Sequence, residues 1–164
     1  MALYHFSVRH VSRGKGQMVV ASAAYISGQR IYDGYYNKIH DYTSKSGVVF
    51  TEILTPEYVP ERMTDRETLW NEVEHVERNN KAQLAYSFDI ALQNELTLEE
   101  NIRLAKEFCQ EQFVVCGMIV DLAVHEGKSD NEEEPDNPHF HVLAPIRPFT
   151  EEGIWGNKQR REYI

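Results

Sequence analysis

Period-two alternation of apolar and polar residues, the pattern of strands with one buried face, recurs along this chain. It is clear in residues 3–9, 84–92, 118–125 and 139–146, and weaker in residues 47–54. Each of the four clear segments has one apolar face. The opposite faces are small or polar and gather Asp89, Asp121, His125, His139 and His141. The alternation therefore predicts a β-sheet with one apolar face and one face rich in histidine and aspartate.

Three further segments predict helices. Thr64 and Thr97 each precede a Glu by three residues, the spacing of a capping box, and helical apolar repeats follow both. Residues 17–27 are rich in Ala, and Gly28 provides a helix end. The order of elements predicts an α+β fold, an antiparallel β-sheet with helices packed on one face.

Length and composition indicate one globular domain. The 164 residues are 41% apolar and 26% charged, which suits a single hydrophobic core. The longest apolar stretches are too short for a membrane span, so no membrane insertion is expected. With only two cysteines we expect reduced thiols in a cytoplasmic protein. Residues 1–164 are expected to be the N-terminal fragment of a longer chain, because the sequence stops without a helix cap or turn signal.

The net charge of -9 argues against a nucleic-acid partner, but it is unevenly distributed. Residues 1–50 hold six Lys/Arg against two Asp/Glu, whereas residues 51–150 hold eight against twenty-one. The last fourteen residues are balanced and include Lys158 and Arg160. An acidic body with basic ends can still present one basic groove.

The histidines are the sharpest chemical signal. His139 and His141 are two apart in a predicted strand and therefore project from one face, and His125 ends the neighbouring predicted strand. Three neutral imidazoles can hold one metal ion and leave coordination positions open, as catalytic sites do. Asp89 and Asp121 on the same face are candidate acceptors for the ring N–H groups.

Tyr25 lies among small residues, which leave its hydroxyl room to approach a substrate. Together with the histidines it belongs to a series of ordered motifs that resembles MobA/MobL relaxases. The motifs are residues 4–8, 12–17 and 23–28, then 91–97, 117–121, 137–142 and 155–158. The resemblance implies an HUH-endonuclease relaxase fold (ferredoxin-like, palm-type) for residues 1–164, the nickase domain.

Relaxases of this family nick one strand at a plasmid or mobile-element transfer origin and so initiate conjugative mobilisation. The resemblance implies that Tyr25 attacks the scissile phosphate to form a 5′-phosphotyrosine, and that His125, His139 and His141 are the metal ligands. Asp89 is the candidate for accepting the proton or orienting a histidine. Phosphoryl chemistry favours Mn²⁺, then Mg²⁺, over Zn²⁺, although three imidazoles also suit zinc.

The implied partner is single-stranded transfer-origin DNA, a hairpin plus the nick site. A coupling ATPase and accessory proteins are further expected partners, and the protein is expected to enter the recipient cell attached to DNA. The candidates for DNA contact are Arg13, Lys15, Lys158 and Arg160, which lie in the two basic regions.

Two other functions remain open from the residues. One is a three-histidine metallohydrolase that acts on nucleic acid through a metal-bound water and forms no adduct. The other is a non-catalytic DNA-binding autoregulator, which binds its site and leaves the strand whole.

Overall fold

The computed structural model describes residues 5–158. The strands and helices, with three short 3-10 turns (η), follow in chain order: β1 (Phe6–Ser12), η1 (Arg13–Lys15), α1 (Val19–Ser27), β2 (Arg30–Asp33), β3 (Lys38–Asp41), β4 (Val48–Leu54), η2 (Glu61–Thr64), α2 (Arg66–Val76), β5 (Gln83–Ala91), α3 (Leu98–Gln112), η3 (Val114–Cys116), β6 (Val120–His125) and β7 (His139–Pro145).

Five strands form one antiparallel sheet in the order β1-β5-β7-β6-β4, and β2 and β3 form a separate hairpin. The predicted α+β class and antiparallel sheet are confirmed. The predicted pairing of β6 with β7 is also confirmed. Because β7 pairs with β5 on its other side, β7 is the central strand of the five.

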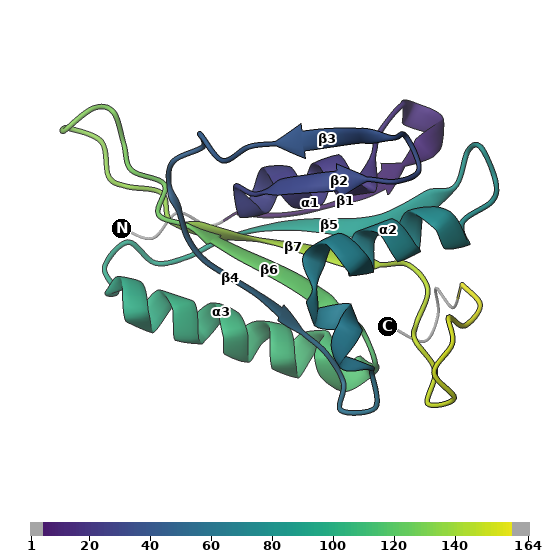
Figure 1. The fold of residues 1–164 in the computed structure, drawn as a ribbon. Helices are drawn as coiled ribbons and strands as arrows, with labels where there is room; N and C mark the ends of the chain where they lie inside the picture. The colour runs from purple at the N-terminus through teal and green to yellow at the C-terminus, as the bar shows by residue number, and fades with distance from the viewer. Residues whose placement is uncertain (1–4, 159–164) are drawn as a thin grey trace.

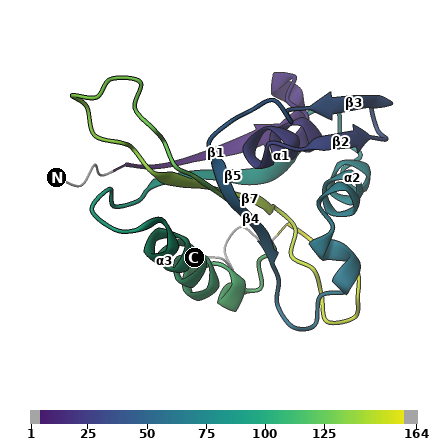
Figure 2. The ribbon, with the colours of Figure 1, turned by 60° about the vertical axis from the view of Figure 1, so that its left-hand side comes forward.

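The helices cover both faces of the sheet, so the prediction that they pack on one face is wrong. Figures 1 and 2 show α3 on one side, with α1, α2 and the β2–β3 hairpin on the other. The face expected to be open contains Ala85, Ala123 and Leu143, which are buried with residues of α1 and α2 in one core cluster. Small side chains at these positions let the two helices approach the sheet closely, while Phe140 and Val142 pack in the second cluster beneath α3.

The two predicted capping boxes have different outcomes. At α3 the prediction is confirmed, since the Thr97 hydroxyl accepts from Glu100 N and the Glu100 carboxylate accepts from Thr97 N. At α2 it is wrong, because Asp65 is the cap and accepts from Thr68 N. The Thr64 hydroxyl instead donates to the carbonyl of Glu61 within η2.

The helix predicted in residues 17–27 is confirmed as α1. It ends at Gly28 as predicted, and Gly28 adopts the left-handed conformation at φ 65°.

The strand boundaries differ in smaller ways. β1 runs on to Ser12 and is described from Phe6, and part of its predicted segment lies outside the described residues. β6 begins at Val120, two residues later than predicted. Sequence reasoning missed the β2–β3 hairpin, since its four-residue strands are too short to show alternation.

The register around β7 brings the predicted histidines together. His125 on β6 lies directly opposite His139, and Ala123 lies opposite His141. On the other side Asp89 of β5 lies opposite His141. Because residues directly opposite share a face, the two central pairings place the three imidazoles and Asp89 on the face covered by α1.

A buried carboxylate fixes α2 to the sheet. Asp121 is fully buried on β6 and accepts from Arg66 Nε at 2.8 Å, Arg66 Nη2 at 2.7 Å and Trp70 Nε1 at 2.8 Å. Arg66 and Trp70 are both in the first part of α2. The prediction that Asp121 orients a histidine is therefore wrong, because its oxygens are used by α2.

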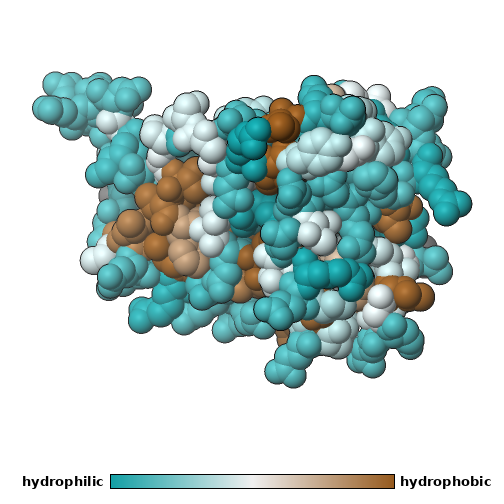
Figure 3. Space-filling model, viewed as in Figure 1, coloured by the Kyte–Doolittle hydropathy of each residue, from teal (hydrophilic) through white to brown (hydrophobic). Residues whose placement is uncertain are grey.

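The face of the molecule seen in Figure 3 is mainly polar. Figure 3 shows hydrophilic residues over most of one face of the molecule, with the apolar residues in separate patches. Within residues 5–158, no helix combines the length and the apolar character that crossing a membrane requires.

Asp121→Ala should lower the free energy of unfolding by about 3–5 kcal/mol, because it leaves the guanidinium of Arg66 buried without its counter-charge. Urea denaturation followed by circular dichroism measures this loss. Asp121→Asn keeps one acceptor for Trp70 and is expected to lose less. A loss below about 1 kcal/mol in the alanine variant would show that the ion pair does not anchor α2.

Candidate active site

Three histidines form a compact cluster at the end of the two central strands. His125 is buried, His139 and His141 are half-buried, and one ring nitrogen from each lies within 4.8 Å of the others. The ring centroids are 4.6 Å apart for His125 and His141 and 4.9 Å apart for His139 and His141. Three nitrogens at these separations can be brought onto one ion with small side-chain movements.

Two of the imidazoles are already oriented by backbone carbonyls. His125 Nε2 lies 2.8 Å from the carbonyl oxygen of Ile26, and His139 Nδ1 lies 2.8 Å from that of Asn137. A carbonyl only accepts, so in the neutral form of each ring this nitrogen carries the hydrogen and the other nitrogen keeps its lone pair. This arrangement suits a metal ligand, because the second partner fixes the tautomer.

Electrostatics also favour the form of histidine that binds metals. Burial lowers the pKa of His125, and burial lowers that of His141 to about 4, with Asp89 acting in the opposite direction. Both rings are therefore neutral at pH 7. The donor set, the fixed tautomers and the neutral state together fit a divalent cation.

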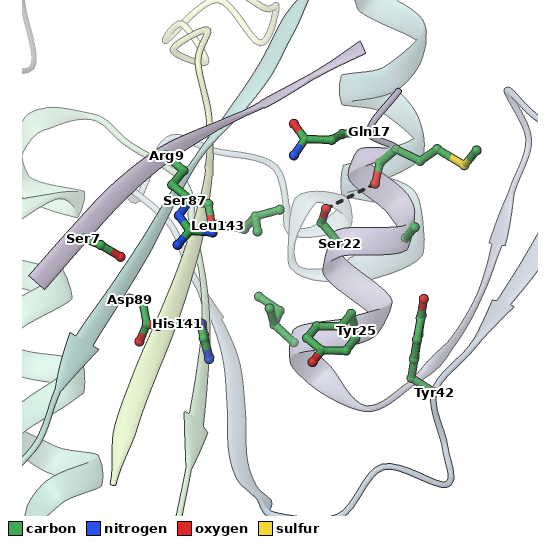
Figure 4. A pocket seen from close by; sticks show the side chains of 13 residues that line it. Ser7, Arg9, Gln17, Ser22, Tyr25, Tyr42, Ser87, Asp89, His141 and Leu143 are labelled. Atoms are coloured by element: carbon green, nitrogen blue, oxygen red, sulfur yellow. Dashed lines mark hydrogen bonds between the residues drawn. The ribbon is translucent and has the colours of Figure 1, made fainter. Parts of the chain in front are cut away.

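A cavity of about 410 Å³ connects this cluster with α1. It lies between α1 and the strands β1, β5 and β7, and Figure 4 shows the side chains around it. Asp89 and His141 line its sheet side, and Gln17, Ser22 and Tyr25 line its helix side. The predicted nucleophile and one predicted metal ligand thus face the same space.

Tyr25 is the exposed member of a buried helix. Its neighbours Ala23, Ala24 and Ile26 are buried, whereas Tyr25 is 52% exposed. Figure 4 shows its hydroxyl directed across the cavity toward the strand that carries His141. Its ring packs edge-to-face against Tyr42 at a centroid distance of 5.3 Å. Of the small residues that suggested room for a substrate, Ala21 and Ser22 line the cavity, whereas Ala23 and Ala24 are buried in the core behind the helix.

The basic residues predicted to contact DNA separate into different groups. Arg13 is buried, and all five of its N–H groups are used by the Glu74 carboxylate and by three backbone carbonyls, so it has a structural role. Lys15 is exposed. Lys158 lies 3.1 Å from Glu77 and donates to the carbonyl of Gln83. Arg160 lies outside the described residues.

Lys45 is a site residue that sequence reasoning missed. Its ammonium nitrogen lies 3.5 Å from the centre of the Tyr25 ring. It stands in the connection between β3 and β4, where no strand or helix pattern distinguishes it from other basic residues of the first fifty. Only the folded backbone brings this connection beside α1.

Comparisons with known proteins agree with this geometry. A family model described as the MobA/MobL family matches residues 17–163. The chain is 37% identical to the conjugal transfer protein TraA of Agrobacterium fabrum, over 96% of this chain and 15% of that protein. It is 32% identical to a probable mobilization protein MobA of Bifidobacterium longum, over 100% of this chain and 28% of that protein. It therefore spans well under two thirds of these relatives.

A solved structure is also similar. It is described as "Molecular Basis of Vancomycin Resistance Transfer in Staphylococcus aureus" and superposes with a TM-score of 0.86 at 38% identity. The match covers 96% of this chain and 77% of that one.

The metal-free protein should lose stability as the pH falls from about 6.5 toward 4. Unfolded His141 takes up a proton in this range, whereas the folded ring, with its pKa lowered to about 4, does not. The loss attributable to His141 is on the order of 3 kcal/mol at its full extent. Urea unfolding at several pH values in chelator measures it, and His141→Gln should show a shallower slope. Equal slopes in both proteins would contradict the assigned burial of His141.

Proposed function

The chain belongs to the MobA/MobL family, and we propose that residues 1–164 are a relaxase domain that nicks one strand of DNA at a transfer origin. The reaction initiates conjugative mobilisation of a plasmid or other mobile element. The observation that carries the proposal is the shared cavity, which Tyr25 and His141 line from opposite sides. The names of the relatives, which describe conjugal transfer and mobilisation, support the same role.

Tyr25 is the proposed nucleophile. Its phenolic oxygen attacks the scissile phosphorus, an O–P bond to tyrosine forms, and the bond from phosphorus to the 3′ oxygen breaks. The phenol loses its proton and the leaving 3′ oxygen gains one, so the products are a 5′-phosphotyrosine and a free 3′-hydroxyl. Because the ester is retained, the strand can be rejoined by the reverse attack.

Asp89 is the proposed proton acceptor or histidine-orienting group. It lines the cavity and lies opposite His141 in the sheet. Its charge favours the protonated form of His141. A carboxylate in this place can take the phenol proton directly or through water.

His125, His139 and His141 are the proposed holders of a divalent ion, with Mn²⁺ first, then Mg²⁺ and Zn²⁺. When bound, such an ion supplies Lewis acidity and neutralises charge on the phosphate. The chain's own contribution is to keep His125 and His141 neutral by burial, to fix two tautomers through Ile26 and Asn137, and to hold Tyr25 across the cavity.

The proposed substrate is single-stranded transfer-origin DNA with a hairpin beside the nick site. Arg9 lines the cavity and is placed to meet a phosphate, and Lys15 and Lys158 are proposed to follow the backbone further out. Arg160, which lies outside the described residues, is a further proposed DNA contact. Arg13 is not included because its donors are used internally. A coupling ATPase and accessory proteins are proposed partners, in the cytoplasm of the donor cell and during transfer to the recipient.

Tyr25→Phe should abolish covalent capture of DNA, reducing adduct by about 10³-fold or more, because it removes the attacking oxygen. The double change His139→Ala and His141→Ala should do the same by removing two metal ligands. The assay mixes the purified chain, Mn²⁺ and a labelled transfer-origin oligonucleotide and separates the products on a denaturing gel. Tyr32→Phe is the matched control, since Tyr32 is also exposed, at 46%, but lies on the hairpin.

The other outcomes of this assay identify other functions. Cleavage without an adduct, also in Tyr25→Phe, would indicate a hydrolase that uses water. Binding of the oligonucleotide with no cleavage at any added metal would indicate a DNA-binding module. Either result would overturn the proposed tyrosine chemistry.

A further inference from the structure

The side chain of Tyr25 is held by contacts from outside its own helix. Lys45 Nζ lies 3.5 Å from the centre of the Tyr25 ring and also donates to the Tyr25 backbone carbonyl at 3.0 Å. One ammonium group thus contacts both the ring and the backbone of the same residue. A tyrosine that is 52% exposed would otherwise be free to change rotamer.

Backbone hydrogen bonds in the connection after β3 hold Lys45 in the position of this contact. Lys45 N donates to the carbonyl of Tyr42, and Tyr42 N donates to the carbonyl of Gln29, just beyond α1. The Tyr42 ring meets the Tyr25 ring edge-to-face at 5.3 Å and an interplanar angle of 88°. A single turn, closed on itself and bonded to the end of α1, therefore brings two groups against one phenol.

The energetics favour an ammonium at this point. The carbonyls of the last turn of a helix have no partners within the helix, and the helix dipole places negative charge there. The Tyr25 carbonyl is one of these, and the next one, Ile26 O, accepts from His125. A cation over an aromatic face contributes about 0.5–2 kcal/mol, and more as it is desolvated. Burial lowers the pKa of Lys45, which reflects such partial desolvation.

We propose that Lys45 is a positioning residue for the nucleophile, holding the Tyr25 phenol against the cavity in the orientation needed for attack. The inference rests on the proposed function. Lys45 limits the ring to one direction, and its positive charge lowers the cost of negative charge that builds on the phenol as the proton leaves. Misplacing a reacting group by about 1 Å can cost about 10²-fold in rate.

Two substitutions separate the charge from the shape of the side chain. Lys45→Met keeps a long unbranched stem and removes the ammonium, whereas Lys45→Arg keeps a cation and N–H donors. Lys106→Met is the matched control, because Lys106 lies on α3 on the opposite side of the sheet, paired with Glu52, and loses the same charge. Urea denaturation checks that all three variants fold.

The decisive measurement is the single-turnover rate of adduct formation at saturating oligonucleotide, together with oligonucleotide affinity. Lys45→Met should slow the rate by about 10- to 100-fold while affinity changes by less than about threefold. Lys45→Arg should restore most of the rate, and Lys106→Met should match the unmodified chain. A normal rate in Lys45→Met overturns the proposal. So does a loss of affinity alone, since that marks a phosphate contact.

A second readout does not depend on activity. In chain labelled with ¹³C-tyrosine and free of DNA, the ring signal of Tyr25, assigned with Tyr25→Phe, should shift and sharpen in Lys45→Met as the ring gains mobility. It should stay in place in Lys106→Met. If the ring signal responds but the unmodified chain forms no adduct, the proposed function fails and the ring contact stands. If the signal does not respond, the positioning role is wrong whatever the activity.

Discussion

The end of α1 is the point on which the site depends, because its last carbonyls have no partners within the helix and receive their donors from other parts of the fold. Here a histidine of β6 donates to Ile26 and a lysine of the β3–β4 connection donates to Tyr25. The first bond joins the helix that carries the tyrosine to a member of the histidine cluster. The distance between Tyr25, the proposed nucleophile, and the histidine cluster is therefore set by hydrogen bonds as well as by packing.

A second set of buried polar contacts supports this arrangement from behind. Asp121 binds Arg66 and Trp70 of α2, and Glu74 of α2 binds Arg13, which follows β1 directly. These pairs attach α2 to the sheet, and α2 in turn packs against α1 in the same core cluster. Buried pairs of this kind cost much to break although they add little net stability. They specify where α1 can lie, and so where Tyr25 can point.

The sequence predicted the main sheet and the three long helices because alternation and helix end signals are local. The grouping of His125, His139 and His141 followed from strand geometry and is confirmed as a cluster. Three features could not be predicted. Ala85 and Ala123 belong to the face that the alternation predicted to be exposed, whereas in the fold they are buried against α1 and α2. Arg13 reads like a surface cation, yet its burial depends on Glu74 sixty-one residues away. Lys45 could not be identified from the sequence, because its contact with Tyr25 is formed only in the folded chain.

The central claim is that Tyr25 becomes joined to DNA at this cavity. The most direct test is to digest the chain with protease and nuclease after reaction with oligonucleotide and Mn²⁺, and to map the remaining nucleotide by tandem mass spectrometry. The account predicts a 5′-phosphate-linked remnant on the peptide that contains residue 25, at the Tyr25 oxygen. A remnant on any other side chain, or a cleaved strand with no modified peptide, would contradict it.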